Sequence, residues 1–108
     1  MHLHRVLILS GIIFAFSAIG GLAQSDPVKG QALAREWCAR CHDVEKTGPF
    51  KQHPPSFASI SVFRAEDQIY GRIAYQPLHS AMPELSYVLS PDNMEDLLTY
   101  IVSLESAE

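Results

Sequence analysis

The sequence predicts an all-α domain with three or more helices. Two stretches begin with a capping side chain and a proline, Ser25-Asp26-Pro27 and Ser90-Pro91-Asp92, an order typical of helix N-termini. Apolar residues then recur at intervals of three and four in both stretches, which is the period of an α-helix. No part of the sequence has a convincing two-residue alternation of apolar and polar residues, so we expect no strand.

The first helix is expected over residues 27–41, with the following residues on one face: Gly30, Leu33, Ala34, Trp37 and Cys41. Residues 43–57 are expected to form a loop, because Gly48-Pro49 and Pro54-Pro55 interrupt any helical period. A second helix is expected over residues 65–74, and a shorter helical segment over residues 57–63.

The last helix has the clearest signal. It is expected to start at Pro91, and its apolar stripe consists of Met94, Leu97, Leu98, Ile101 and Leu104. The preceding residues 76–90 are expected to be extended or in turns, because Pro77 and Pro83 break a helix.

Residues 1–23 have the three parts of a secretory signal peptide. Arg5 gives a basic start, an apolar run extends from Val6 to Ile19, and small residues precede a cleavage site after Ala23. We therefore expect residues 24–108 to form one domain that is exported to the periplasm. The alternative is an uncleaved segment that anchors the domain to the inner membrane, since about 18 apolar residues are the lower limit for spanning a bilayer.

Residues 38–42 read Cys-Ala-Arg-Cys-His, the C-x-x-C-H sequence to which a c-type haem is attached. Two thiols at this spacing can each form a thioether with one vinyl group of the same haem. Cys38 and Cys41 are the only cysteines of the chain, so the motif accounts for both. The sequence therefore predicts one covalently bound haem c, whose metal is iron.

His42 directly follows the second cysteine and is the expected proximal iron ligand. A ligating histidine usually has its other ring nitrogen held by a hydrogen-bond acceptor. A backbone carbonyl of the proline-bearing loop is the natural acceptor, with Pro55 or Pro54 preferred over Pro49.

Met82 is the expected distal ligand, because it lies in a loop and is followed by Pro83, whereas Met94 belongs to the stripe of the last helix. A thioether is a soft ligand, and Met/His ligation raises the haem potential. His79 is the alternative distal ligand. The expected apolar neighbours of the haem are Trp37, Phe57, Ile60, Ile69, Leu85 and Leu97.

The chain has a formal net charge of −4, and removal of residues 1–23 takes away one arginine and no acid. This acidic balance argues against nucleic acids and anionic membrane surfaces as partners. It favours redox donor and acceptor proteins that dock through a basic or neutral patch.

Taken in order, these motifs resemble those of a small class I monohaem cytochrome c. The resemblance rests on Gly30, Leu33 and Trp37 before the C-x-x-C-H motif, on Pro54-Pro55-x-Phe57, on Met82-Pro83-Glu84-Leu85, and on Ser90-Pro91-Asp92 with Leu97, Tyr100 and Ile101. It implies helices wrapped around one haem, with the first and last helices crossing at Gly30 and Tyr100. It also implies one-electron transfer between redox partners in the periplasm rather than an enzyme activity.

Other functions stay open on the sequence alone. The Trp37-Cys38-x-x-Cys41 spacing also occurs in thioredoxin-like proteins, but the residues before it read as helix rather than strand. Two cysteines and a histidine could hold zinc, although no second ligand pair follows. An open distal position would give a ligand-binding haem sensor or a peroxidase-like activity. The domain could also be the haem c subunit of a larger oxidoreductase.

Overall fold

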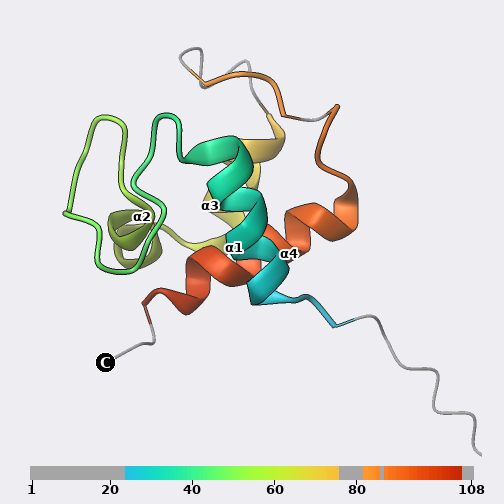
Figure 1. The fold of residues 1–108 in the computed structure, drawn as a ribbon, viewed down its shortest axis with the longest axis horizontal. Helices are drawn as coiled ribbons and strands as arrows, with labels where there is room; N and C mark the ends of the chain where they lie inside the picture. Colours follow the sequence, from blue (N-terminus) through green and yellow to red (C-terminus); the bar gives the residue numbers. More distant parts are fainter. Residues whose placement is uncertain (1–23, 76–81, 86, 106–108) are drawn as a thin grey trace, which may run out of the picture.

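The structure describes residues 24–75, 82–85 and 87–105, which form helices joined by loops (Figure 1). In this computed structural model the element order is α1 (Pro27–Leu33), η1 (Ala34–Cys38), α2 (Phe57–Phe63), α3 (Glu66–Ala74) and α4 (Pro91–Ser103). These residues contain no strand, only an isolated bridge between Gln52 and Pro55. The predicted all-α class is confirmed. The predicted signal peptide, residues 1–23, lies outside the described residues.

The helices begin where the local sequence signals predict. The Asp26 carboxylate accepts the backbone N–H of Val28 at 2.8 Å at the start of α1. The Ser90 hydroxyl accepts the backbone N–H of Asn93 at 3.2 Å at the start of α4. Both bonds satisfy donors that a helix N-terminus leaves without an intrahelical partner. The short helix α2 is confirmed, and α3 begins one residue later than predicted.

The prediction of one α-helix over residues 27–41 is wrong. The α-helical hydrogen bonds end at Leu33, and η1 is a π-helical turn in which Ala39 N–H donates to the Ala34 carbonyl at 3.0 Å. The wider turn changes which residues share a face. Of the predicted face, Gly30 and Ala34 are buried and Leu33 packs against the core, but Trp37 is 38% exposed and Cys41 is exposed, and Cys38 is buried instead.

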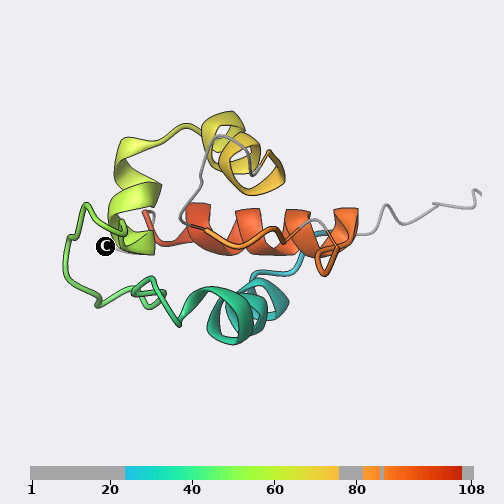
Figure 2. The same cartoon turned by 90° about the horizontal axis from the view of Figure 1, so that it is seen from above.

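Helix α4 forms the middle of the fold. Figure 2 shows α1 and η1 on one side of it and α2 and α3 on the other. Leu97 and Ile101 of α4 are each 1% exposed, so the centre of the hydrophobic core lies along this helix. Of the predicted stripe, Met94 and Leu98 are buried there as well, and Leu104, just after the end of α4, is partly buried against the core.

Helices α1 and α4 cross at Gly30, as the family resemblance implied. A Cβ atom at this position would lie 2.0 Å from the Asp96 carbonyl oxygen and 2.7 Å from the Tyr100 Cβ. Real Cβ atoms do not approach other atoms so closely, so only glycine permits the two backbones to pass at this distance.

The chain just before α1 is bound to α4. The Asp26 backbone N–H donates to the buried Asp96 carboxylate at 2.6 Å, and the Thr99 hydroxyl donates to the Ser25 hydroxyl at 2.7 Å. The segment just before the first helix is therefore held against α4 through both Ser25 and Asp26.

Candidate haem site

The two cysteines lie at the end of η1 and in the turn that follows it. The backbone N–H groups of Cys41 and His42 both donate to the Cys38 carbonyl, at 3.1 and 2.9 Å, and this closes the turn. Both cysteines are free thiols, Cys38 buried and Cys41 exposed. Burial raises the pKa of the Cys38 thiol to about 11, because a thiolate is poorly solvated at this position. A neutral thioether has no such penalty and suits the site.

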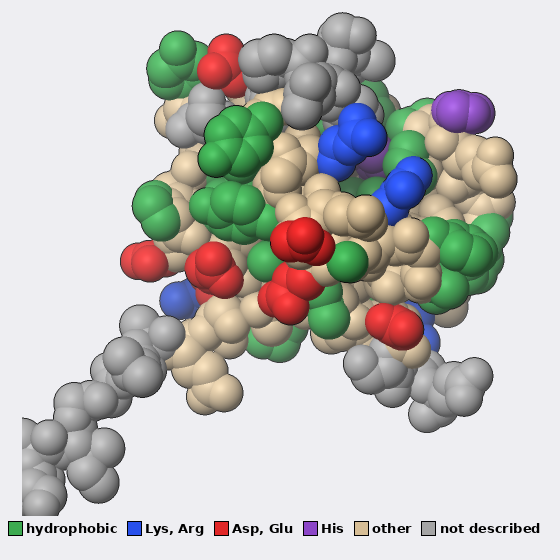
Figure 3. All heavy atoms as spheres, turned by 180° about the vertical axis from the view of Figure 1, so that it is seen from behind, with side chains coloured by type: hydrophobic (Ala, Val, Ile, Leu, Met, Phe, Trp, Pro, Cys, Tyr) green, Lys and Arg blue, Asp and Glu red, His purple; other side chains and the backbone are tan. Residues whose placement is uncertain are grey.

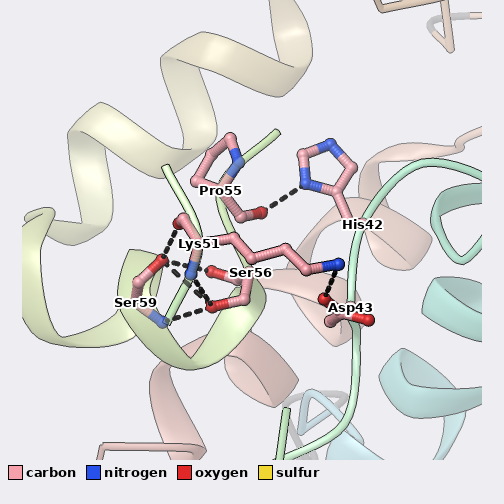
Figure 4. A network of polar contacts seen from close by, with 6 residues as sticks. All are labelled: His42, Asp43, Lys51, Pro55, Ser56 and Ser59. Atoms are coloured by element: carbon pink, nitrogen blue, oxygen red, sulfur yellow. Dashed lines mark hydrogen bonds and ion pairs between the residues drawn. The ribbon is translucent and has the colours of Figure 1, made fainter. Parts of the chain in front are cut away.

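The ring of His42 is held by the carbonyl of Pro55. The His42 Nδ1 atom lies 2.6 Å from the Pro55 carbonyl oxygen (Figure 4). Because a carbonyl only accepts, Nδ1 must donate, and the neutral ring then has its lone pair on Nε2. This is the tautomer that a metal-binding imidazole needs, with the second nitrogen fixed by a backbone acceptor. Of the three prolines that the sequence left open, the structure has Pro55 in this position.

A network of short polar contacts fixes the loop that presents Pro55 (Figure 4). The Lys51 carbonyl accepts the Ser56 backbone N–H at 3.2 Å and the Ser59 hydroxyl at 3.0 Å. The Lys51 ammonium forms an ion pair with Asp43, the residue that follows His42, at 2.5 Å. The loop is therefore tied both to the start of α2 and to the segment that bears the histidine.

The predicted apolar neighbours divide into two groups. Phe57 is buried at the start of α2, and its ring centroid lies 5.6 Å from that of His42. Leu85 and Ile69 are buried in the core, and Ile60 packs against it. Trp37 is more exposed and belongs to the surface of η1.

Met82 is partly buried and packs against the hydrophobic core. Its neighbour Pro83 is exposed, and Leu85 two residues later is 4% exposed. The segment therefore enters the core at both Met82 and Leu85. His79, the alternative distal ligand, lies outside the described residues.

These residues fit a covalently attached haem. Two free thiols with two residues between them can accept the thioether bonds, and the next residue presents an imidazole with a free Nε2 lone pair. The adjoining side chains of Phe57 and the core are apolar, as a large flat ring system requires. A thioredoxin-like frame is excluded, because a helix rather than a strand precedes Cys38. No described helix is both long enough and apolar enough to cross a membrane.

A family model described as cytochrome c oxidase, cbb3-type, subunit III matches residues 25–101. The chain belongs to the cytochrome c family. Its cofactor is therefore haem c with iron, bound covalently, and Cys38 and Cys41 fit the attachment.

Two curated cytochromes are similar to this one. A cytochrome c-552 of Bradyrhizobium diazoefficiens is 36% identical over 107 residues, which cover 96% of this chain and 98% of that protein. A cytochrome c2 of Pararhodospirillum photometricum is 33% identical over 57 residues, which cover 53% of this chain and 48% of that protein. No solved structure gives a significant match to this cytochrome.

Proposed function

We propose that this cytochrome carries single electrons between redox partner proteins in the periplasm, with His42 as the proximal and Met82 as the distal iron ligand. The observation that supports it most is the 2.6 Å contact between His42 Nδ1 and the Pro55 carbonyl, directly after the two cysteines. This contact fixes the tautomer and the orientation of the imidazole. The names of the relatives, cytochrome c-552 and cytochrome c2, support the same role.

The haem iron supplies the one-electron chemistry, and the residues of the chain hold it and tune it. Cys38 and Cys41 fix the haem covalently, so it is retained in either oxidation state. His42 donates from Nδ1 to Pro55, which makes its Nε2 a stronger ligand. A thioether from Met82 favours the reduced iron and raises the potential relative to a second histidine.

The absorption spectrum of the oxidised, haem-loaded protein tests this ligand assignment. We expect the weak sulfur-to-iron charge-transfer band at the red edge of the visible spectrum. Substitution Met82→Leu should abolish the band and lower the reduction potential, because it replaces the sulfur by a side chain of similar volume. Met94→Leu is the matched control, since Met94 is buried in α4 and should leave the band unchanged.

A c-type spectrum without the sulfur band would contradict the assignment of Met82. It would leave the haem in place and favour His79 or an open distal position, and therefore sensing or peroxidase-like chemistry. A band that persists in Met82→Leu but disappears in Met94→Leu would show that Met94, and not Met82, is the distal ligand.

The binding of Ser25 and Asp26 to α4 supports export with cleavage after Ala23. Only Gln24 separates Ala23 from Ser25, which is the first described residue that is bonded to α4. An uncleaved membrane segment would therefore press α1 and the acidic residues beside it against the lipid headgroups, with no linker between them. The mass of the protein isolated from the periplasm would test this, and a mass that includes residues 1–23 would contradict it.

We also propose that the redox partners dock through a basic or neutral patch. The chain has a net charge of −4, and acidic side chains gather over the lower half of the face shown in Figure 3. Glu66, Asp67 and Asp92 are exposed in the first turns of α3 and α4. With a basic patch, association should slow as the ionic strength rises, because salt screens the attraction, whereas with a neutral patch the rate should depend little on salt.

A second candidate function follows from the description of the matching family model, which names a subunit of cbb3-type cytochrome c oxidase. This cytochrome would then be the haem c subunit of a larger oxidoreductase rather than a diffusing carrier. Gel filtration of the native protein after gentle extraction distinguishes the two. Elution as a small monomer favours the carrier, and stable co-elution with other redox subunits favours the subunit.

A further inference from the structure

The three residues that follow His42 are each held from a different part of the fold. The Asp43 carbonyl accepts the backbone N–H of Phe57, the first residue of α2, at 2.9 Å. The Val44 carbonyl accepts the Tyr100 hydroxyl of α4 at 2.6 Å. The path of the chain after the proximal histidine is therefore fixed by helices that lie far away in the sequence.

The third tie comes from the first helical stretch. The Glu45 carboxylate accepts Arg35 Nε at 2.5 Å and Gln31 Nε2 at 3.1 Å. Both donors are on α1 and η1, and the side chains of Arg35 and Glu45 are about half exposed. Exposed ion pairs of this kind contribute little in water. The hydrogen bond between Tyr100 and Val44 differs from this ion pair, because both Tyr100 and Val44 are buried.

Tyr100 is 5% exposed and Val44 is 4% exposed. Burial raises the pKa of the Tyr100 hydroxyl, so it remains a proton donor throughout the physiological range. In such a dry place an unsatisfied carbonyl is costly, whereas a satisfied one fixes the backbone. The Cβ atom of Tyr100 lies at the crossing of α1 and α4, and its hydroxyl reaches from that helix to the Val44 carbonyl of the histidine segment.

We propose that the Tyr100 hydroxyl is a positioning group for His42, which holds the segment after the histidine so that its ring stays on the Pro55 carbonyl. The buried ring of Tyr100 contributes to the hydrophobic core, and the hydroxyl has this separate role. The inference rests on the proposed function, because it takes His42 as the proximal ligand. On this inference, the Tyr100 hydroxyl of α4 helps to orient the imidazole of His42 on the proximal side of the haem.

The test is the rate at which the His42 Nδ1 proton exchanges with water, measured by proton NMR of the reduced, haem-loaded protein. Tyr100→Phe keeps the aromatic ring, so the helix crossing is preserved, and it removes only the donor to Val44. We expect the Nδ1 proton to exchange about tenfold faster, the effect of losing one buried hydrogen bond. The Phe57 amide proton, which donates to Asp43, should also exchange faster.

Thr99→Val is the matched control. Thr99 is the residue before Tyr100 on the same helix, and its hydroxyl bonds to Ser25 rather than to the histidine segment. The control therefore also removes one hydroxyl hydrogen bond of α4, but it should leave the His42 Nδ1 proton unchanged. If the His42 Nδ1 proton exchanges faster in Tyr100→Phe than in Thr99→Val while the two variants melt at similar temperatures, the effect comes from the lost bond to Val44 and not from a general loss of stability.

Equal exchange of the Nδ1 proton in Tyr100→Phe and Thr99→Val would overturn the inference and leave the proposed function intact. Wild-type protein without a resonance from an iron-bound His42 would overturn the proposed function, and this inference with it. The two failures are distinguishable. Failure of the inference requires that the wild-type spectrum contains the resonance of an iron-bound His42, whereas failure of the proposed function requires that this resonance is missing.

Discussion

Substitution of Gly30 by alanine should destabilise this cytochrome far more than the size of one methyl group indicates. The new Cβ would lie 2.0 Å from the Asp96 carbonyl oxygen and 2.6 Å from its carbonyl carbon, both of them backbone atoms of α4. An ordinary contact begins at 3.4 Å, so the two helices must separate by about 1.4 Å. No side-chain rotation can relieve this clash.

The expected magnitude follows from two opposing effects. Overpacking of a core costs about 1–3 kcal/mol, and a clash with backbone belongs at the upper end of that range. Alanine has a higher helix propensity than glycine, which stabilises the helix by up to about 1 kcal/mol and offsets part of this cost. The net loss is therefore about 2 kcal/mol. For a domain of this size that loss lowers the melting temperature by roughly 8–16 °C.

Thermal unfolding of the haem-loaded protein, followed by circular dichroism, measures this effect. Gly71→Ala is the matched control, because Gly71 lies in α3 and a Cβ there would meet nothing within 4 Å. The control should keep or raise the melting temperature through helix propensity alone. A melting temperature for Gly30→Ala within about 2 °C of wild type would refute the reasoning, since it would require the crossing to open without cost.

Two further predictions concern the cofactor and the pH dependence of stability. The chain expressed without haem attachment should lose most of its helical circular dichroism, because a chain of 108 residues or fewer buries a limited surface without its cofactor. Retention of the full signal would contradict this. Arg35 lowers the pKa of the Glu45 carboxyl through their hydrogen bond. The pair therefore stabilises the fold at pH values above the ordinary glutamate pKa of 4.5, and this contribution is lost as the pH falls through the lowered pKa of Glu45. The melting temperatures of wild type and Arg35→Gln should therefore differ at pH 7 and converge in acid, and a difference independent of pH would exclude the linkage.

The parts of the fold that the sequence predicted well are those specified by neighbouring residues. The caps at Asp26 and Ser90 and the prolines after them are local signals, and α1 and α4 begin where those signals place them. The apolar stripe of α4 was equally readable, because Leu97 and Ile101 follow the helical period and both are fully buried. Such features need no knowledge of the rest of the chain.

The π-helical turn at the end of the first helix could not be predicted in this way. A bond from Ala39 to Ala34 replaces the usual one, and nothing in the five residues of η1 specifies it locally. Its consequence is tertiary, since it buries Cys38 in the core and leaves Trp37 at the surface. The helical period therefore predicted the buried face correctly at Gly30, Leu33 and Ala34 and failed at Trp37 and Cys41, where the π-turn begins to act.

The proximal site was half predictable. The C-x-x-C-H motif predicts His42 as the ligand, but the proline that its ring contacts depends on how the loop folds back, which the contacts of Lys51 and Ser59 determine. The bond from Tyr100 to Val44 spans 56 residues and has no sequence signal at all. The family resemblance placed Tyr100 at the helix crossing, but nothing in the sequence indicated that its hydroxyl bonds to Val44.

The two proposed iron ligands are held by different forces. His42 is fixed at its backbone N–H by Cys38, at its ring by Pro55, and by contact with Phe57. The Met82 side chain has no hydrogen-bond donor, so packing against the core must position it. A proximal ligand bound at several points stays in place when the charge on the iron changes, as an electron carrier requires. Any exchange of ligands should therefore begin on the methionine side, where the contacts seen among the described residues are apolar packing.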